Sequence, residues 1–192
     1  MTLGPGAFVR VGVLLFLAVV LQLSAVGQIG ALGSYADLTP LVVAAVAYYA
    51  GSTAGAATGF VAGVLLDLAT GATMGASSLV LTAVGYAVGR LRELRDPSHG
   101  LLPLVVGAAA TAGWVVAYAM VSFMLDVGAT VSPLVLRDAA VTVLLNTLIA
   151  LPVFAACRAV VRPVLLVDPL DRRRRRRAPR DAGPLGLRGL EV

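Results

Sequence analysis

Charged residues are scarce in this sequence. They make up 13% of its 192 residues, and lysine does not occur at all. Soluble domains carry about 25% charged residues, whereas 59% of this chain is hydrophobic and its mean hydropathy is +0.93. So little polar surface excludes a fold that faces water on all sides, and it predicts an all-α integral membrane protein.

Cysteine and histidine are equally rare, with one residue of each. Cys157 cannot form a disulfide within the chain, and we interpret it as a buried, unreactive thiol. His99 has no cysteine, histidine or paired carboxylate at metal-ligand spacing nearby, so we interpret it as solvated. The sequence also lacks a phosphate-binding glycine loop and a nucleophile paired with a base. We therefore expect no catalytic residue, no metal and no cofactor.

Long apolar runs are what the sequence has in abundance. A helix needs about 20 apolar residues to cross a bilayer, and fewer where it packs inside a bundle. Six segments qualify, and they predict a six-helix transmembrane bundle within residues 1–166. The predicted helices cover residues 8–26, 38–50, 53–69, 75–89, 101–125 and 134–161.

Two of these segments have alternative interpretations. Only Gly51 and Ser52 separate the second segment from the third, so the two form either a tight hairpin or one long broken helix. The alternative for the first segment is a cleaved signal peptide, because Ala25-Val26-Gly27 resembles a processing site. We favour an uncleaved anchor, since the apolar stretch is longer than that of a typical signal peptide.

The positions of the arginines predict the orientation. If the N-terminus is cytoplasmic and the chain crosses six times, fourteen of the fifteen arginines fall on the cytoplasmic side and only Arg137 lies outside. Positively charged residues gather on the cytoplasmic side of membrane proteins. We therefore predict a multi-pass protein with both termini in the cytoplasm.

Residues 167–192 differ from the rest of the chain. They are rich in arginine, proline and glycine and nearly free of aromatic and β-branched residues, which predicts a disordered cytoplasmic tail. Its arginine run either fixes the topology or holds anionic lipid headgroups, at about 1 kcal/mol per arginine, and both can be true. Without aromatic residues or a folded context, we expect no nucleic-acid binding. The run consists of Arg172, Arg173, Arg174, Arg175, Arg176 and Arg177.

Glycines recur at every fourth residue around the third segment, at Gly51, Gly55, Gly59 and Gly63. Each step of four residues advances about 40° around a helix, so these glycines trace a smooth groove along it. In lipid, small residues let helix backbones approach and dispersion contacts accumulate. We predict that the third segment is a central helix, packed by its neighbours through this groove in a right-handed crossing.

Asp67 lies two residues before the end of the third predicted segment, where water or a neighbouring helix can reach it. We interpret it as an interfacial carboxylate that hydrogen-bonds the turn at residues 70–73, and direct contact with a ligand or partner is the alternative. Gly71 and Gly75 fit a tight reversal after it.

Two residues stand out in the middle of the later segments. For Asn146 we expect an interhelical hydrogen bond of about 1 kcal/mol. A transport site is the alternative, although no second buried ionisable residue accompanies Asn146. We interpret Trp114 as part of the bundle packing or as an anchor that faces a partner.

The region from Gly55 to Gly75 resembles the signature of the MreD family of rod shape-determining proteins, and the resemblance extends over about residues 8–162. Asp37-Leu38 and Gly85-Tyr86 also fit. Three residues of this chain differ from those common in the family. Ala36 stands where the family often has proline, Thr70 where serine is common, and Met74 where leucine is common. The signature is a small-xxx-small helix that ends in Leu65-Leu66-Asp67-Leu68, followed by Thr70-Gly71 and Met74-Gly75.

This resemblance implies a non-enzymatic scaffold of the bacterial cell-wall elongation complex, located in the inner (plasma) membrane. Such a scaffold binds MreC, the bitopic partner, and helps control cell shape and peptidoglycan synthesis. We expect the partner contacts near the outer loops at Asp37, Asp67 and Asp126.

The resemblance also implies a fold like that of S-components, the substrate-binding membrane subunits of vitamin transporters. That function is our alternative hypothesis. It needs an outward pocket lined by aromatic and polar groups, whereas the chain has five phenylalanines, five tyrosines and one tryptophan. Few of these lie near the outer loops, so we expect no small-molecule substrate.

Overall fold

The computed structural model describes residues 5–24, 30–31, 34–71, 73–94, 102–125 and 133–165. This part of the chain forms six helices, which confirms the predicted all-α class. Its strands are limited to β1 (Gly30–Ala31) and β2 (Ser34–Tyr35), which pair antiparallel. The helices are α1 (Pro5–Ser24), α2 (Leu38–Ala50), α3 (Ser52–Thr70), α4 (Ala76–Leu94), α5 (Leu102–Met124) and α6 (Pro133–Leu165).

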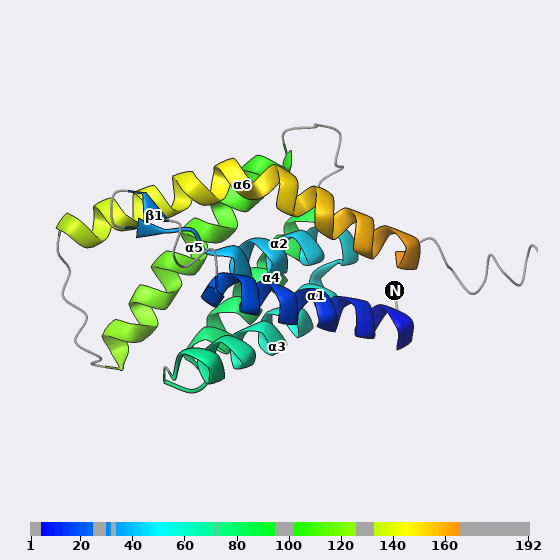
Figure 1. The fold of residues 1–192 in the computed structure, drawn as a ribbon, viewed down its shortest axis with the longest axis horizontal. Helices are drawn as coiled ribbons and strands as arrows, with labels where there is room; N and C mark the ends of the chain where they lie inside the picture. Colours follow the sequence, from blue (N-terminus) through cyan, green and yellow to red (C-terminus); the bar gives the residue numbers. More distant parts are fainter. Residues whose placement is uncertain are drawn as a thin grey trace, which may run out of the picture.

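The helices run back and forth along one axis (Figure 1). Helices α1, α3 and α5 run away from the end of the bundle at which α1 begins, and α2, α4 and α6 return to it. The first helix therefore begins, and the last helix ends, at the same end of the molecule, which we call the termini end. The opposite end is called the far end.

Helix α2 forms the centre of the bundle. All residues from Thr39 to Tyr48 are buried, and α2 packs against each of the other five helices. Its Val- and Ala-rich sequence is apolar on every side, which is the pattern of a helix surrounded by others. The prediction that the third segment is the central helix is therefore corrected, since α3 packs chiefly against α4.

Helices α2 and α3 are separate and form a tight hairpin. The reversal takes place at Gly51, whose φ of 95° and ψ of 179° are strained for other residues. The N–H of Gly51 donates to the carbonyl oxygen of Ala47, and the carbonyl oxygen of Gly51 accepts from Gly55, both at 2.9 Å. Gly51 therefore ends α2 and begins α3, and it lies outside the glycine face of α3.

Three of the described helices are long and apolar enough to cross a membrane, namely α3, α5 and residues 134–161 of α6. Helix α2 and residues 9–24 of α1 are apolar but shorter. Helix α4 continues past residue 89, where its predicted segment ends, to Leu94. These apolar helices identify the chain as a membrane protein.

Candidate functional site

Helices α3 and α4 meet backbone to backbone. Three glycines of α3 face α4 so closely that a Cβ atom added to any of them would overlap the α4 backbone. In real proteins, Cβ atoms essentially never lie within 3.0 Å of a non-bonded heavy atom. A Cβ atom on Gly55 would lie 2.4 Å from the carbonyl oxygen of Gly85, and one on Gly59 would lie 2.2 Å from the carbonyl oxygen of Leu81. A Cβ atom on Gly63 would lie 2.1 Å from the Cα of Ser78.

Helix α4 contributes two glycines to the same contact. A Cβ on Gly85 would lie 2.2 Å from the carbonyl oxygen of Gly55, and one on Gly89 would lie 2.4 Å from the Cα of Ser52. This role was not predicted, although Gly85 and Gly89 have the same four-residue spacing in the sequence as the glycines of α3. We call the contact the glycine seam, made by Gly55, Gly59, Gly63, Gly85 and Gly89.

Asp67 closes the seam at the far end. Its side chain is only 2% exposed. One carboxylate oxygen accepts from the N–H of Gly75 at 2.8 Å, and the other accepts from the N–H of Ser77 at 3.2 Å. The partners therefore lie at the start of α4 and not in the turn at residues 70–73. The N–H groups of a first helical turn lack partners within the helix and attract negative charge, so Asp67 of α3 caps α4.

Gly71 and Gly75 build the reversal between these two helices. Gly71 has a φ of 65° in the left-handed region at the end of α3, and Gly75 has a φ of 99° just before α4. Left-handed backbone at these two points favours glycine. The reversal brings the N–H groups of Gly75 and Ser77 within hydrogen-bond distance of the Asp67 carboxylate.

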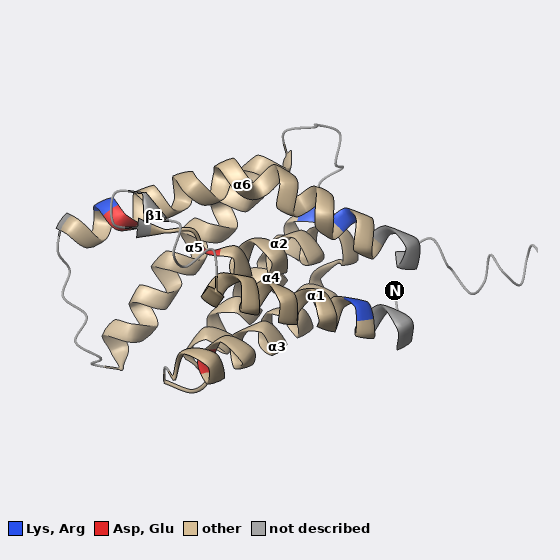
Figure 2. Cartoon of the chain, in the orientation of Figure 1, with Lys and Arg blue, Asp and Glu red and all other residues tan. Residues whose placement is uncertain are grey.

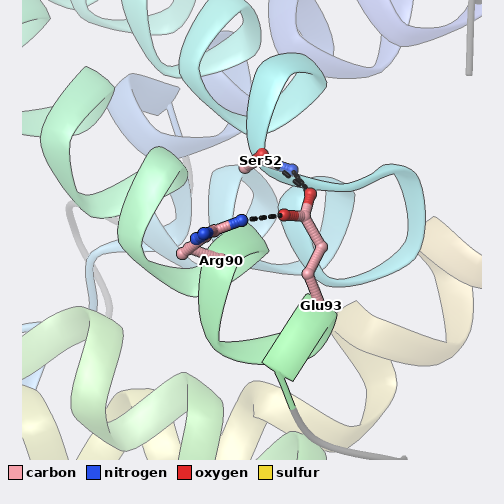
Figure 3. Close-up of polar contacts among 3 residues, drawn as sticks. All are labelled: Ser52, Arg90 and Glu93. Atoms are coloured by element: carbon pink, nitrogen blue, oxygen red, sulfur yellow. Dashed lines mark hydrogen bonds and ion pairs between the residues drawn. The ribbon is translucent and has the colours of Figure 1, made fainter.

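Glu93 closes the seam at the termini end (Figure 3). Its carboxylate lies in the last turn of α4 and accepts from Ser52, at 3.0 Å from the backbone N–H and 2.7 Å from the hydroxyl. The second carboxylate oxygen lies 3.2 Å from Arg90. These hydrogen bonds, led by the backbone N–H of Ser52, lower the pKa of the Glu93 carboxyl. Each helix of the pair thus supplies, near its own C-terminus, the acid that caps its neighbour.

A second residue of α4, Arg92, contacts the hairpin between α2 and α3. The guanidinium of Arg92 donates to the carbonyl oxygen of Tyr49 at 2.7 Å, near the C-terminus of α2. A cation there and the Glu93 carboxylate at the start of α3 both match the partial charges of helix ends.

A second polar site joins four parts of the chain, and we call it the Asp37 cluster (Gln22, Asp37, Thr111, Trp114 and Asn146). Asn146 of α6 is fully buried. Its amide oxygen accepts from the N–H of Asp37, and its amide nitrogen donates to the carbonyl oxygen of Asp37, both at 2.8 Å. The same nitrogen lies 3.1 Å from the hydroxyl oxygen of Thr111 on α5. Asn146 thereby links the start of α2 to both α5 and α6.

The carboxylate of Asp37 is enclosed by two donors. The indole N–H of Trp114 donates to one oxygen at 2.9 Å, and the side-chain amide of Gln22 donates to the other. The amide oxygen of Gln22 accepts from the N–H groups of Leu38 and Thr39. Gln22 of α1 therefore caps α2, whereas Asp37, directly before the helix, makes no side-chain cap. Gln22 was not predicted as a site residue, and its only signal in the sequence is a side-chain amide in an otherwise apolar segment.

The far halves of α5 and α6 are more exposed than the rest of these helices. The last buried residue of α5 is Trp114, and the first of α6 is Asn146. Beyond these points, residues 115–124 and 134–145 contain no buried side chain, and the two helices diverge (Figure 1). We call these two stretches the open arms. Their large exposed apolar residues include Val116, Met120, Phe123, Met124, Leu134, Leu136 and Leu144.

Charged residues in the described part lie mostly towards the two ends of the helices (Figure 2). Arg10, Arg90, Arg92 and Arg158 belong to the termini end, and Arg137 belongs to the far end. Among the described residues, no three histidine, cysteine, aspartate or glutamate side chains come together as a metal site requires. Asp126, His99 and the arginine run at residues 172–177 lie outside the described residues.

Comparison with known proteins gives one match. A family model described as rod shape-determining protein MreD matches residues 5–160, which include all of the glycine seam, the Asp37 cluster and the open arms. No curated protein and no solved structure matches the chain significantly. The resemblance to the S-component fold therefore stays a prediction.

Proposed function

Because the chain belongs to the MreD family of rod shape-determining proteins, we propose that it is a non-enzymatic scaffold of the elongation complex. In this role it binds MreC in the bacterial inner membrane and helps control peptidoglycan synthesis. The observation that carries the proposal is the family match over residues 5–160, which covers the whole bundle apart from the end of α6.

The charge distribution supports a cytoplasmic position for the termini end. Arg10, Arg90, Arg92 and Arg158 all belong to it, and the arginine run at residues 172–177 follows α6 in sequence. Arginine and lysine are concentrated on the cytoplasmic side of membrane proteins. The far end, with Asp67 and the open arms, then faces the outside.

Helix lengths support a position of the Asp37 cluster within the bilayer. Helix α2 has 13 residues, which span about 20 Å, whereas the hydrocarbon core is about 30 Å thick. Along α6, Asn146 lies twelve residues from Arg158, or about 18 Å. If Arg158 is at the headgroup level, the cluster lies past the middle of the membrane, and α2 does not reach the outer surface.

The open arms are therefore our proposed surface for MreC. In the outer half of the membrane they extend past the start of α2, and large apolar side chains such as Met120, Phe123 and Leu144 are exposed on them. Met120 and Met124 add flexible, polarizable side chains that adapt to a partner. The carboxylates of Asp37 and Asp67, by contrast, are occupied by hydrogen bonds inside the protein, so we assign them to structure.

Co-purification tests this proposal. The full-length chain carrying an affinity tag is expressed with MreC, solubilised in several mild detergents and captured. We expect MreC to be retained by the wild type and by Leu79→Ala, an exposed residue of α4 outside the arms. Met120→Ala combined with Leu144→Ala should retain markedly less MreC while keeping the wild-type melting temperature.

Two results would count against the proposal in different ways. Failure of the wild type to retain MreC in every detergent would overturn the partnership. Equal retention by the double variant and by Leu79→Ala would leave the partnership in place but show that the open arms are the wrong surface.

A further inference from the structure

An apolar groove runs along the outside of the bundle between α1 and α6. Its volume is about 570 Å³. Val13, Leu17 and Leu21 of α1 line one side, Ala156 of α6 lines the other, and Val42 of α2 contributes to the base. Every lining residue is apolar except Arg10 and Cys157.

The groove has a buried base and exposed rims. Val42 at the base is 5% exposed, and Cys157 is 2% exposed. On the rim, Val13 is 54% exposed and Leu17 is 52% exposed. On a membrane protein, a groove of this shape opens towards lipid. A lipid acyl chain that enters the groove would cover its apolar base.

The length of the groove corresponds to one leaflet. Arg10 and Leu21 are eleven residues apart on α1, which gives about 16 Å along the helix. Half of a hydrocarbon core of about 30 Å is about 15 Å. The groove therefore reaches from the headgroup level at Arg10 to the middle of the bilayer, which is the path of one acyl chain.

The charge at the mouth of the groove selects the headgroup. Arg10 is exposed and lies at the termini end of α1, and none of the described residues that line the groove is acidic. An arginine near the membrane surface attracts anionic lipid, and its guanidinium matches the geometry of a phosphate. We propose that the groove binds one anionic phospholipid of the leaflet at the termini end, with an acyl chain between α1 and α6 and the phosphate at Arg10.

Other occupants fit the groove less well. Residues 166–192 of this chain are rich in arginine and proline and have the wrong chemistry for an apolar groove. Exposed valine and leucine side chains form the α1 rim of this groove. A flexible acyl chain can follow such a rim.

Native mass spectrometry of the purified full-length chain tests the site. The protein is loaded with phosphatidylglycerol or phosphatidylcholine in equal amounts, and the lipids retained after delipidation are counted. We expect one phosphatidylglycerol to be retained by the wild type. Ala156→Trp, which fills the groove from an exposed position, should lose it, whereas Phe60→Trp, at an exposed position on α3, should keep it.

The charge is tested separately. Arg10→Gln should lower the preference for phosphatidylglycerol over phosphatidylcholine about fivefold. Arg158→Gln is the matched control, because Arg158 is exposed at the same end but does not line the groove. A variant with all six arginines at 172–177 changed to glutamine separates the groove from the tail and should still retain the lipid.

The proposal fails if Ala156→Trp retains phosphatidylglycerol as the wild type does, if phosphatidylcholine is retained equally well, or if the tail variant loses the lipid. Because the lipid test needs no MreC, its result is independent of the proposed scaffold function.

Discussion

The α3–α4 pair and the α5–α6 pair are both antiparallel neighbours in sequence, but only the first is packed from end to end. In the first pair, glycines on both helices bring the backbones together, and Asp67 and Glu93 cap the two ends. In the second pair, Trp114 is the last buried residue of α5 and Asn146 is the first of α6, and the open arms continue without buried residues.

This difference shows what drives packing in a bilayer. Most side chains in the open arms are apolar, yet apolarity brings no advantage where the alternative neighbour is lipid. The spacing of small residues and the supply of hydrogen-bond partners decide which surfaces join. The seam therefore provides stability, and the arms remain available for another molecule.

The largest expected effect comes from blocking the seam. Gly59→Leu should destabilise the bundle by about 3 kcal/mol or prevent folding, because the new side chain overlaps the α4 backbone. Size-exclusion profiles and melting temperatures in detergent measure the loss. Gly113→Leu on α5 is the matched control, since the nearest atom to a Cβ there is Val84 Cγ2 at 3.9 Å. Leu79→Ala should also be nearly silent, and similar losses in all three variants would mean that the seam is not the packed face.

Removal of the buried cap should have the next largest effect. Asp67→Ala leaves two amides at the start of α4 without an acceptor, and we expect a loss of about 2 kcal/mol. Asp67→Asn keeps one acceptor oxygen and should lose less. The melting temperatures of the two variants test the ranking, and an alanine variant as stable as the asparagine variant would contradict it.

Asn146 is the first buried residue of α6. Asn146→Ala should cost about 1.5 kcal/mol, because it removes interhelical hydrogen bonds in lipid. Trp114 is the only tryptophan in the sequence, so its fluorescence reports directly on the Asp37 cluster. We expect its emission to shift towards longer wavelength in the variant, whereas an unchanged spectrum would show that the cluster holds without Asn146.

The exposed cap should show a smaller effect that depends on pH. The pKa of Glu93 is below its ordinary value of 4.5 in the folded protein, so the carboxylate favours folding at pH values above 4.5. That contribution is lost as the pH falls through the lowered pKa. Acidification from about pH 6 to about pH 3.5 should therefore lower the melting temperature of the wild type more than that of Glu93→Gln. If the melting temperatures of the two proteins fell equally with pH, the Glu93 carboxylate would not contribute to stability.

Substitutions in the open arms should change stability least. Phe123→Ala or Leu136→Ala should alter the free energy of unfolding by less than about 0.5 kcal/mol, as is usual for exposed positions. Chemical or thermal unfolding in detergent measures this. A loss as large as that of Asp67→Ala would mean that the arms pack within the protein, and it would remove the contrast with the seam.

The sequence alone determined the membrane class, the six helices and the family, because each depends on composition, local periodicity or a short motif. The four-residue spacing of the glycines also identified a helix face made for close approach. The spacing alone does not show that α4 is the neighbour that packs against this face. The same spacing at Gly85 and Gly89 is the signal in the sequence for the matching face of α4.

Only the tertiary structure decided which groups meet. Asp67 bonds to amides eight and ten residues away, Gln22 caps a helix that starts sixteen residues later, and Asn146 joins Asp37 across 109 residues. The central place of α2 likewise depends on five neighbours at once. Hydrophobicity fixes that a helix is in the membrane, but lipid and protein are equally apolar, so contacts between helices depend on shape and on hydrogen-bond partners that lie far apart in the sequence.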